Sequence, residues 1–297
     1  SARKNYVSNP EFLREGSAVK DFLWPDRVVI GADSEYAFSV MQDIYRPLYI
    51  NEKPIIHTNI ATAEMIKYAA NGFLALKISY VNEVANLCEK VGADVHMVTK
   101  AMGKDGRISS KFLHPGPGFG GSCFPKDTQA IVNISKEKNV PMGTLEAAIK
   151  TNNKQKKRMV QKLKKLLDET FANKTIGILG LSFKPNTDDV RESSALDIIK
   201  SIVNQGGKIK AYDPIANDAM KQYFPNLNYC DSWISACDQT NGVVILTEWN
   251  EFRSIDLVKL KTLMVDPIIL DTRNILSMEQ LSKHGFIFDN VGRLPSK

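Results

Sequence analysis

The sequence predicts an α/β protein in three parts: the end of an N-terminal α/β domain, a central long-helix region, and a C-terminal doubly wound parallel sheet of the Rossmann-like type. Apolar residues recur at helical spacing from Asn59 to Val91 without a proline. After residue 174, short apolar strands alternate with helical patterns. We therefore expect domains at residues 1–58, 59–170 and 171–297.

Composition is that of an ordinary folded protein, because 43% of the residues are hydrophobic and 24% are charged. No apolar run approaches the roughly 20 residues of a membrane helix, and the polar first residues do not resemble a signal peptide. We therefore expect a cytoplasmic protein without a membrane partner. The four cysteines and four histidines are scattered, which predicts reduced thiols and no metal site.

The net charge of +6 raises the question of nucleic-acid binding, and the densest basic run lies between Lys154 and Lys165. Apolar residues interleave with these charges at helical spacing. The pattern therefore predicts an amphipathic helix over Asn152 to Glu169 with its charges in solvent, and no nucleic-acid partner. A modest positive charge also suits an enzyme with anionic substrates.

The first 58 residues predict part of an α/β domain. Strands are expected near Val7, over Arg27 to Gly31 and near Pro54 to His57, with a helix over Tyr36 to Leu48. A dinucleotide site needs a strand, a glycine-rich turn and a helix, and we find no such fingerprint before residue 60. We therefore expect a chain that lacks the front, dinucleotide-binding half of this domain.

The long helix predicted from Asn59 to Val91 exceeds 25 residues, which is typical of a spine shared by domains or subunits. Lys67 and Asn71 lie four residues apart and therefore on one face. The spacing alone fits a surface lysine with a polar neighbour equally well. A shorter helix, about Val95 to Met102, precedes a turn that contains Arg107.

A glycine-rich segment ends at Cys123, two residues before Pro125, which predicts a helix that begins there. The positive end of a helix dipole and the nearby Lys126 favour a thiolate. Asp127 follows one turn later. Three glycines allow the backbone to approach a ligand: Gly118, Gly120 and Gly121. A buried, inert cysteine in a glycine turn is the alternative, but this combination favours a nucleophile.

The last 127 residues (171–297) alternate strand and helix patterns. Strands are expected over residues 174–180, 208–213, 242–247 and 268–271, with a helix over 193–205. Ligands of such a sheet bind at the carboxyl ends of its strands. The turn after the first strand reads GxxGxxF and lacks the middle glycine of the dinucleotide fingerprint, so it is weak evidence for a cofactor site here.

Four motifs in order resemble the UDP-glucose 6-dehydrogenase family. They are NPEFLREG at residues 9–16, the helix segment at 63–83, GFGGSCFPKD at 118–127, and GILGLSFKPNTDDVRESSALDII at 177–199. The resemblance implies NAD-dependent oxidation of UDP-glucose at C6 to UDP-glucuronate, for polysaccharide biosynthesis. It also implies that the missing half carries the NAD fingerprint, so that this chain is a fragment inactive alone.

The resemblance assigns roles to individual residues. Cys123 would hold the sugar as a thiohemiacetal and then a thioester, and Lys67 with Asn71 would stabilise the negative oxygen. Asp127 would orient the water or base, and Glu11 would activate the hydrolytic water. The implied substrate-binding residues are Phe12, Leu13, Glu15, Arg107, Phe112, Phe119, Gly120, Lys184 and Arg273. The implied NAD contacts are Glu15 and Arg191.

Arg107 is implied to reach the substrate of a neighbouring subunit, so we expect a homo-oligomer, at least a dimer through the long helix. GDP-mannose and UDP-N-acetylmannosamine dehydrogenases share this architecture, although Phe124 and NPEFLREG favour UDP-glucose. A chain that only binds nucleotide sugars and oligomerises, without catalysis, is a second alternative. A cysteine hydrolase is disfavoured, because no histidine lies in a matched motif beside Cys123.

Overall fold

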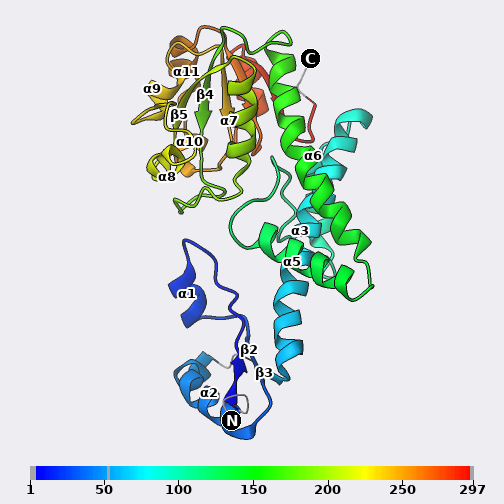
Figure 1. Cartoon of the computed structure of the whole chain (residues 1–297). Helices are drawn as coiled ribbons and strands as arrows, with labels where there is room; N and C mark the ends of the chain where they lie inside the picture. The colour runs from blue at the N-terminus through cyan, green and yellow to red at the C-terminus, as the bar shows by residue number, and fades with distance from the viewer. Residues whose placement is uncertain (1–4, 52–53, 295–297) are drawn as a thin grey trace. The chain divides into compact units, whose positions relative to one another are not determined.

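The computed structural model describes residues 5–51 and 54–294, and the chain divides into two compact units, Ser1–Phe73 and Leu74–Lys297 (Figure 1). Helix α3, Ile60–Val91, is one continuous helix of 32 residues, which confirms the predicted long helix. The division into two units does not test the predicted domains 1–58, 59–170 and 171–297, which stay a prediction.

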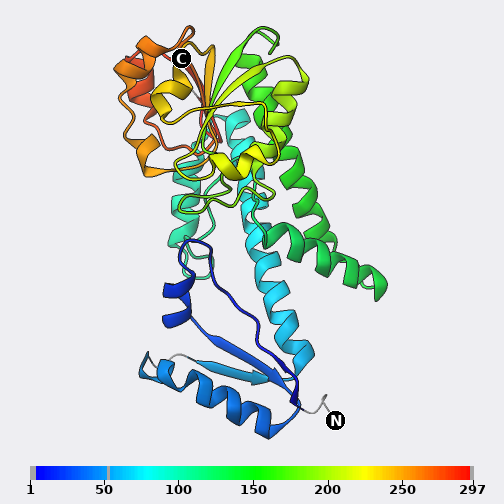
Figure 2. The ribbon, with the colours of Figure 1, turned by 60° about the vertical axis from the view of Figure 1, so that its left-hand side comes forward.

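The first unit contains a small sheet in the order β1-β2-β3, in which β1 is antiparallel to β2 and β3 is parallel to it. All residues of the central strand β2 are buried. Figure 2 shows α2 running beside this sheet. The elements are β1 (Val7–Ser8), α1 (Ala18–Leu23), β2 (Val28–Ala32), α2 (Glu35–Tyr45) and β3 (Ile55–Thr58).

Helix α2 ends three residues before the predicted Leu48 and continues as a 3₁₀ helix over Arg46–Asn51. Pro47 explains the change, because proline lacks the N–H donor that would continue the α-helical hydrogen bonds. At the other end, the Ser34 hydroxyl caps α2 by accepting a hydrogen bond from the Ala37 N–H at 3.1 Å.

Three helices of the second unit lie between α3 and the first strand of its sheet: α4 (Val95–Lys104), α5 (Phe124–Glu137) and α6 (Gly143–Leu166). Cys123 is the N-cap of α5 and Pro125 lies in its first turn, as predicted. Helix α6 begins at Gly143 rather than at the predicted Asn152. Leu145 and Ala148 are buried and extend the same apolar face toward the N-terminus, which explains the earlier start.

The sheet of the second unit has six parallel strands in the order β6-β5-β4-β7-β8-β9 within the described residues. This order confirms the predicted doubly wound sheet, whose direction of winding reverses beside β4. The strands are β4 (Thr175–Leu179), β5 (Lys208–Tyr212), β6 (Asn228–Tyr229), β7 (Gly242–Ile245), β8 (Ile268–Asp271) and β9 (Ile287–Asn290). The helices are α7 (Ser194–Asn204), α8 (Asn217–Lys221), α9 (Trp233–Cys237), α10 (Asn250–Arg253), α11 (Leu257–Leu263) and α12 (Met278–Lys283).

Successive residues of a strand point to opposite faces of the sheet, so the strands contribute side chains to two separate hydrophobic cores. Val244 joins a core that contains Leu163 of α6 and Ile198 of α7. Its neighbour Ile245 joins the core on the opposite face, which contains Phe252 of α10. Helix α6 is therefore part of the covering layer of the sheet, so it forms one unit with it (Figure 1).

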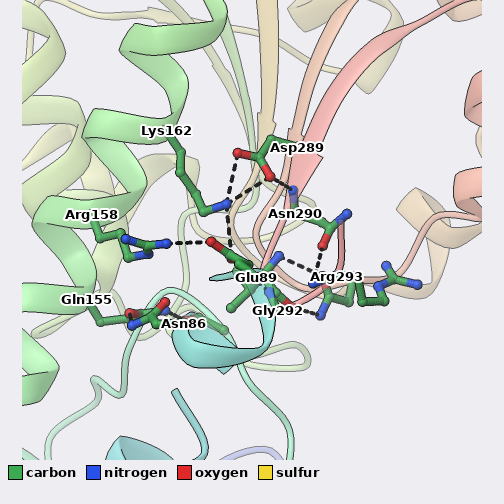
Figure 3. A network of polar contacts seen from close by, with 12 residues as sticks. Asn86, Glu89, Gln155, Arg158, Lys162, Asp289, Asn290, Gly292 and Arg293 are labelled. Atoms are coloured by element: carbon green, nitrogen blue, oxygen red, sulfur yellow. Dashed lines mark hydrogen bonds and ion pairs between the residues drawn. The ribbon is translucent and has the colours of Figure 1, made fainter. Parts of the chain in front are cut away.

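The prediction that the basic charges of α6 all lie in solvent is wrong for two lysines. Lys162 places its ammonium 3.0 Å from Glu89 of α3 and 2.8 Å from Asp289 of β9, and its side chain is only 10% exposed (Figure 3). Lys156 is also buried and pairs with Asp197 at 2.7 Å. Others, such as Lys154, are exposed as predicted.

Candidate active site

The segment before α5, which we call the glycine loop (residues 116–122), is shaped by protein packing. A Cβ atom on Gly120 would lie 2.3 Å from the Glu192 carbonyl oxygen, and one on Gly121 would lie 2.8 Å from the Phe183 ring. Gly121 also has a positive φ of 81°, which L residues rarely adopt. Both glycines are therefore required for packing against the protein's own chain, and the expectation that the loop backbone also approaches a ligand stays a prediction.

Cys123 is half-buried at the start of α5, with its sulfur 3.6 Å from the Ser122 hydroxyl. The adjoining Phe124 ring contacts Phe112 and Phe119 edge-on, at centroid distances of 6.0 and 6.1 Å. Asp127 lies one turn further, is 4% exposed, and donates its N–H to the Cys123 carbonyl at 2.9 Å. The structure thus brings these predicted site residues together around the cysteine.

Arg273 follows β8 and reaches across the carboxyl end of the sheet. Its Nε donates to the Leu246 carbonyl at 2.6 Å and lies 3.1 Å from a Glu248 carboxylate oxygen. Its Nη2 donates to the Phe183 carbonyl at 3.2 Å. A Cβ atom on Gly116 would lie 3.5 Å from its Nη1, so the guanidinium borders the glycine loop.

Lys184 lies on the same side, because its ammonium sits 5.3 Å from the centroid of the Phe183 ring. Phe183 is the residue whose ring packs on Gly121 of the glycine loop. Arg273, Lys184 and the cysteine segment are therefore gathered in one unit, at the sheet edge where doubly wound folds bind ligands.

The turn after β4 is closed by Asp213, which lies at the end of β5. One carboxylate oxygen accepts from the Leu181 N–H at 2.8 Å and from the Ser182 N–H at 3.1 Å. In dinucleotide domains the amides of this turn face a pyrophosphate and the acid after the second strand faces a ribose. Here the two sets of groups bond to each other, and Asp213 is 2% exposed. The amides of this turn are therefore already bonded to the protein's own carboxylate.

The first unit gathers four of its predicted site residues. Lys67 of α3 donates to a Glu11 carboxylate oxygen at 2.5 Å and to the Glu11 carbonyl. The same ammonium lies 5.8 Å from the centroid of the Phe12 ring. The second Glu11 oxygen accepts from the Leu13 N–H at 2.7 Å. The motif NPEFLREG is thus anchored on α3 by Lys67, whose side chain is 18% exposed.

The remaining predicted site residues are Arg107, Arg191, Asn71 and Glu15. Arg107 is 89% exposed and pairs with Asp105 at 2.6 Å, rather than with a residue of the glycine loop. Arg191 pairs with Asp189 at 2.8 Å and is 59% exposed, although its carbonyl accepts from the Gly121 N–H at 2.9 Å. Asn71, one turn beyond Lys67 on α3, and Glu15, between β1 and α1, are both half-buried.

The sequence did not predict a role for three buried amide residues next to the glycine loop: Asn82 of α3 and Asn152 and Gln155 of α6. All three bond to backbone atoms of the loop. A signal existed, because Asn152 and Gln155 fall on the helix face that Met159 and Leu163 continue. Polar residues on an apolar face are buried only with partners, so they mark a hydrogen-bonded neighbour.

In the part of the chain that the structure describes, no helix is both long and apolar enough to cross a membrane. Over the same residues, we find no group of three or more histidine, cysteine, aspartate or glutamate side chains placed to hold a metal ion.

Three family models match the chain. Residues 61–154 match the central domain of the UDP-glucose/GDP-mannose dehydrogenase family, and residues 177–278 match its UDP binding domain. Residues 2–49 match the NAD binding domain of the same family. The expectation that the chain lacks its NAD-binding half is therefore wrong, because residues of that domain are present.

The chain is 47% identical over 290 residues to a UDP-glucose 6-dehydrogenase of Rickettsia bellii, covering 97% of this chain and 67% of that protein. It is 47% identical to the UDP-glucose 6-dehydrogenase TuaD of Bacillus subtilis, covering 97% and 62%. It thus spans about two thirds of the length of these relatives.

A solved UDP-glucose dehydrogenase from Pyrobaculum islandicum is 36% identical with a TM-score of 0.88, covering 97% of this chain and 63% of that one. A UDP-D-ManNAc dehydrogenase from Pyrococcus horikoshii is 29% identical with a TM-score of 0.83, covering 97% and 64%. Both structural matches cover nearly the whole of this chain. Together with the three matched domains, they show that the chain belongs to the UDP-glucose/GDP-mannose dehydrogenase family.

Proposed function

We propose that this chain binds UDP-glucose and takes part in its NAD-dependent oxidation at C6 to UDP-glucuronate. One observation carries the proposal: the half-buried Cys123, at a helix N-terminus, shares one unit and one sheet edge with Arg273 and Lys184. Cations at a sheet edge suit a diphosphate, and a cysteine sulfur beside them suits covalent capture of an aldehyde.

In this proposal the Cys123 sulfur adds to the C6 aldehyde to form a thiohemiacetal, which would lose a hydride to bound NAD and so become a thioester. Water then cleaves the thioester, which releases the acid and restores the thiol. Asp127 orients the water or the base. Lys67 and Asn71 stabilise the negative oxygen, and Glu11 activates the hydrolytic water. Lys67 and Glu11 form a salt bridge, and this proximity supports roles for both side chains in the same reaction.

NAD, when bound, accepts the hydride. The strand-to-helix turns of the described residues do not form a pyrophosphate cradle. A Cβ atom on Gly31, near the end of β2, would lie 2.5 Å from the Ala63 Cβ, so this glycine serves packing on α3. Asp213 fills the turn after β4. We assign NAD contacts in this chain only to Glu15 and Arg191.

The uridine diphosphate is proposed to lie along Lys184 and Arg273, with the hexose toward Phe112, Phe119 and Gly120. UDP-glucose is favoured over other nucleotide sugars because relatives 47% identical are UDP-glucose 6-dehydrogenases, whereas the likeness to the UDP-D-ManNAc dehydrogenase is 29%. Phe12, Leu13 and Glu15 are proposed to contact the sugar from the first unit's motif.

The chain is proposed to form a homodimer through α3. Three large apolar side chains recur on this helix every seven residues and are exposed: Phe73 by 61%, Tyr80 by 52% and Leu87 by 62%. A stripe with this period packs against another helix. The exposed Arg107 is proposed to reach the substrate held by the partner subunit.

Calorimetric titration of the chain with UDP-glucose, UDP and GDP-mannose tests this function. UDP and UDP-glucose should bind, and Arg273→Ala should weaken both by about tenfold or more, since a charge-assisted hydrogen bond is lost. Arg253→Ala, an exposed arginine on α10, is the matched control and should change nothing. Preference for GDP-mannose, or absence of UDP binding, would overturn the proposal.

A further inference from the structure

Asn152 holds both backbone groups of a single residue in the glycine loop. Its Oδ1 accepts from the Phe119 N–H at 2.7 Å, and its Nδ2 donates to the Phe119 carbonyl at 3.0 Å. The side chain is 4% exposed, so these bonds form away from water. Unmade hydrogen bonds are costly in such surroundings, and the pair therefore fixes the position of Phe119.

Gly116, at the start of the loop, is held in the same manner by two residues. The Asn82 Oδ1 accepts from its N–H at 2.8 Å, and the Gln155 Nε2 donates to its carbonyl at 2.9 Å. Asn82 is fully buried and Gln155 is 1% exposed. Gln155 is itself fixed by Asn86, which donates to its Oε1 at 2.9 Å, as Figure 3 shows.

This support is connected to the cysteine through two aromatic rings. Phe119 packs edge-on against Phe124 at 6.1 Å, and Phe124 is the first residue of α5, next to Cys123. On the far side, the Gly121 N–H donates to the Arg191 carbonyl at 2.9 Å. The loop is therefore fixed before and after Gly120, and the cysteine follows directly.

Gly118 is matched to this arrangement. Its φ is +114°, and a Cβ atom at this position would lie 2.8 Å from the Asn152 Oδ1. Any side chain would push the amide away from Phe119. The absence of a side chain at Gly118 therefore makes room for the Asn152 amide, although 34 positions separate the two residues in the sequence (118 and 152).

We propose that Asn152 is a positioning residue for Cys123, and that Gln155 and Asn82 complete the same support. The proposal rests on the proposed function in that it takes Cys123 as the reacting group. Asn152 acts through the backbone of Phe119 and does not touch the substrate. The chemistry of an amide is needed, because one side chain must donate and accept at once.

Alkylation of the four cysteines by iodoacetamide, followed for each by mass spectrometry, tests the proposal in the full chain. Cys88, Cys230 and Cys237 are buried and serve as internal references. The variants are Asn152→Ala and the isosteric Asn152→Asp, which keeps the volume but cannot donate to the Phe119 carbonyl. Asn153→Ala, an exposed neighbour on α6, is the control.

Both Asn152 variants should speed alkylation of Cys123 by about fivefold or more, the factor that corresponds to one lost hydrogen bond. The three reference cysteines and the control variant should be unchanged. An unchanged Cys123 rate, a parallel rise at all four cysteines, or wild-type behaviour of Asn152→Asp would each overturn the proposal. A parallel rise would mean that Asn152 only stabilises the fold.

Hydrogen exchange of the wild-type chain gives a second test that needs no variant. The Phe119 and Gly116 amides should exchange slowly, and rapid exchange at both would overturn the proposal. Neither measurement requires turnover or nucleotide binding. A chain that does not bind UDP would therefore contradict the proposed function but not the positioning role of Asn152. A chain that binds UDP but fails the alkylation and exchange tests would contradict only the positioning role.

Discussion

The chemistry proposed for Cys123 depends on a few local backbone features. The glycine loop ends at Cys123, the N-cap of α5, whose side chain forms no capping hydrogen bond with the first turn. Phe119 and Phe124 shield this end of the loop. Pro125 and the glycines made the helix start predictable from the sequence. The amide support did not follow from local pattern, because each of its hydrogen bonds spans more than 30 residues.

Gly118→Ala should destabilise the chain. A residue with a side chain at φ +114° is strained, and its Cβ would lie 2.8 Å from the Asn152 Oδ1. We expect a loss of about 2 kcal/mol in the free energy of unfolding, measured in urea. Gly106→Ala is the control, since nothing lies within 4 Å of its added Cβ, and it should be near neutral. Equal effects of the two substitutions would contradict this account of the loop.

At the scale of elements, an ion network joins α3, α6 and β9 in the second unit (Figure 3). Glu89 accepts from Arg158 and from the Gly292 N–H, the latter at 2.9 Å, and Lys162 lies between Glu89 and Asp289. The charges balance, which limits the cost of burying them. The sequence pattern predicted that Lys162 lies in solvent. Its partner Asp289 lies 127 residues away, and a local pattern cannot identify such a distant partner.

Lys162→Met should remove the centre of this network, so that Asp289, which is 22% exposed, loses its ion pair and Glu89 keeps only Arg158 as a charged partner. We expect the free energy of unfolding to fall by about 3 kcal/mol, as for other broken buried pairs. Lys221→Met breaks an exposed pair with Asp218 and should cost under about 0.5 kcal/mol. Urea unfolding measures both, and a loss no greater for Lys162→Met than for the control would refute the role of the network.

In the first unit, α1 is tied to the segment before it by Asp21. Its carboxylate accepts from the Arg14 Nη2 at 2.5 Å, from the Arg14 N–H at 2.9 Å and from the Ser17 hydroxyl at 3.0 Å. The Arg14 guanidinium holds the pKa of Asp21 below its ordinary value of 3.8. A depressed carboxyl pKa contributes stability above the ordinary value, and that contribution is lost as the pH falls.

Asp21→Asn should therefore destabilise the chain at about pH 7, and the difference from wild type should shrink as the pH falls below about 4. The measurement is unfolding in urea across that range. Asp218→Asn, at an exposed pair, provides the comparison and should show little difference at any pH. A difference for Asp21→Asn that stays constant or grows toward low pH would show that the ion pair does not act as described.

At the scale of the whole chain, the predicted α/β class, the long helix and the doubly wound sheet are confirmed. These features repeat along the sequence with a fixed period, so local pattern suffices to find them. The start of α6 was missed, although Leu145 and Ala148 of its first turns continue the buried apolar face of the helix. The roles of Lys67, Asn71 and Glu11 stay predictions from the motifs.

The proposed dimer is tested by Leu87→Glu, which places a charge at the C-terminal end of the exposed stripe on α3. Sedimentation should show a dimer for the wild-type chain and a shift toward monomer for the variant, since burying an unpaired carboxylate is unfavourable. Lys90→Glu, also exposed on α3, should leave the dimer in place. A monomeric wild-type chain would contradict the proposed assembly.

The most direct test of the central claim, that the chain holds the hexose of UDP-glucose at Cys123, is the rate of Cys123 alkylation with and without ligand. Saturating UDP-glucose should slow alkylation of Cys123 by about tenfold or more, because the sugar covers the half-buried sulfur, whereas UDP alone should protect it less. Cys88, Cys230 and Cys237 should react equally in all samples. If UDP-glucose binds and Cys123 is alkylated at the unprotected rate, the sugar does not lie at the cysteine and the proposed site is wrong.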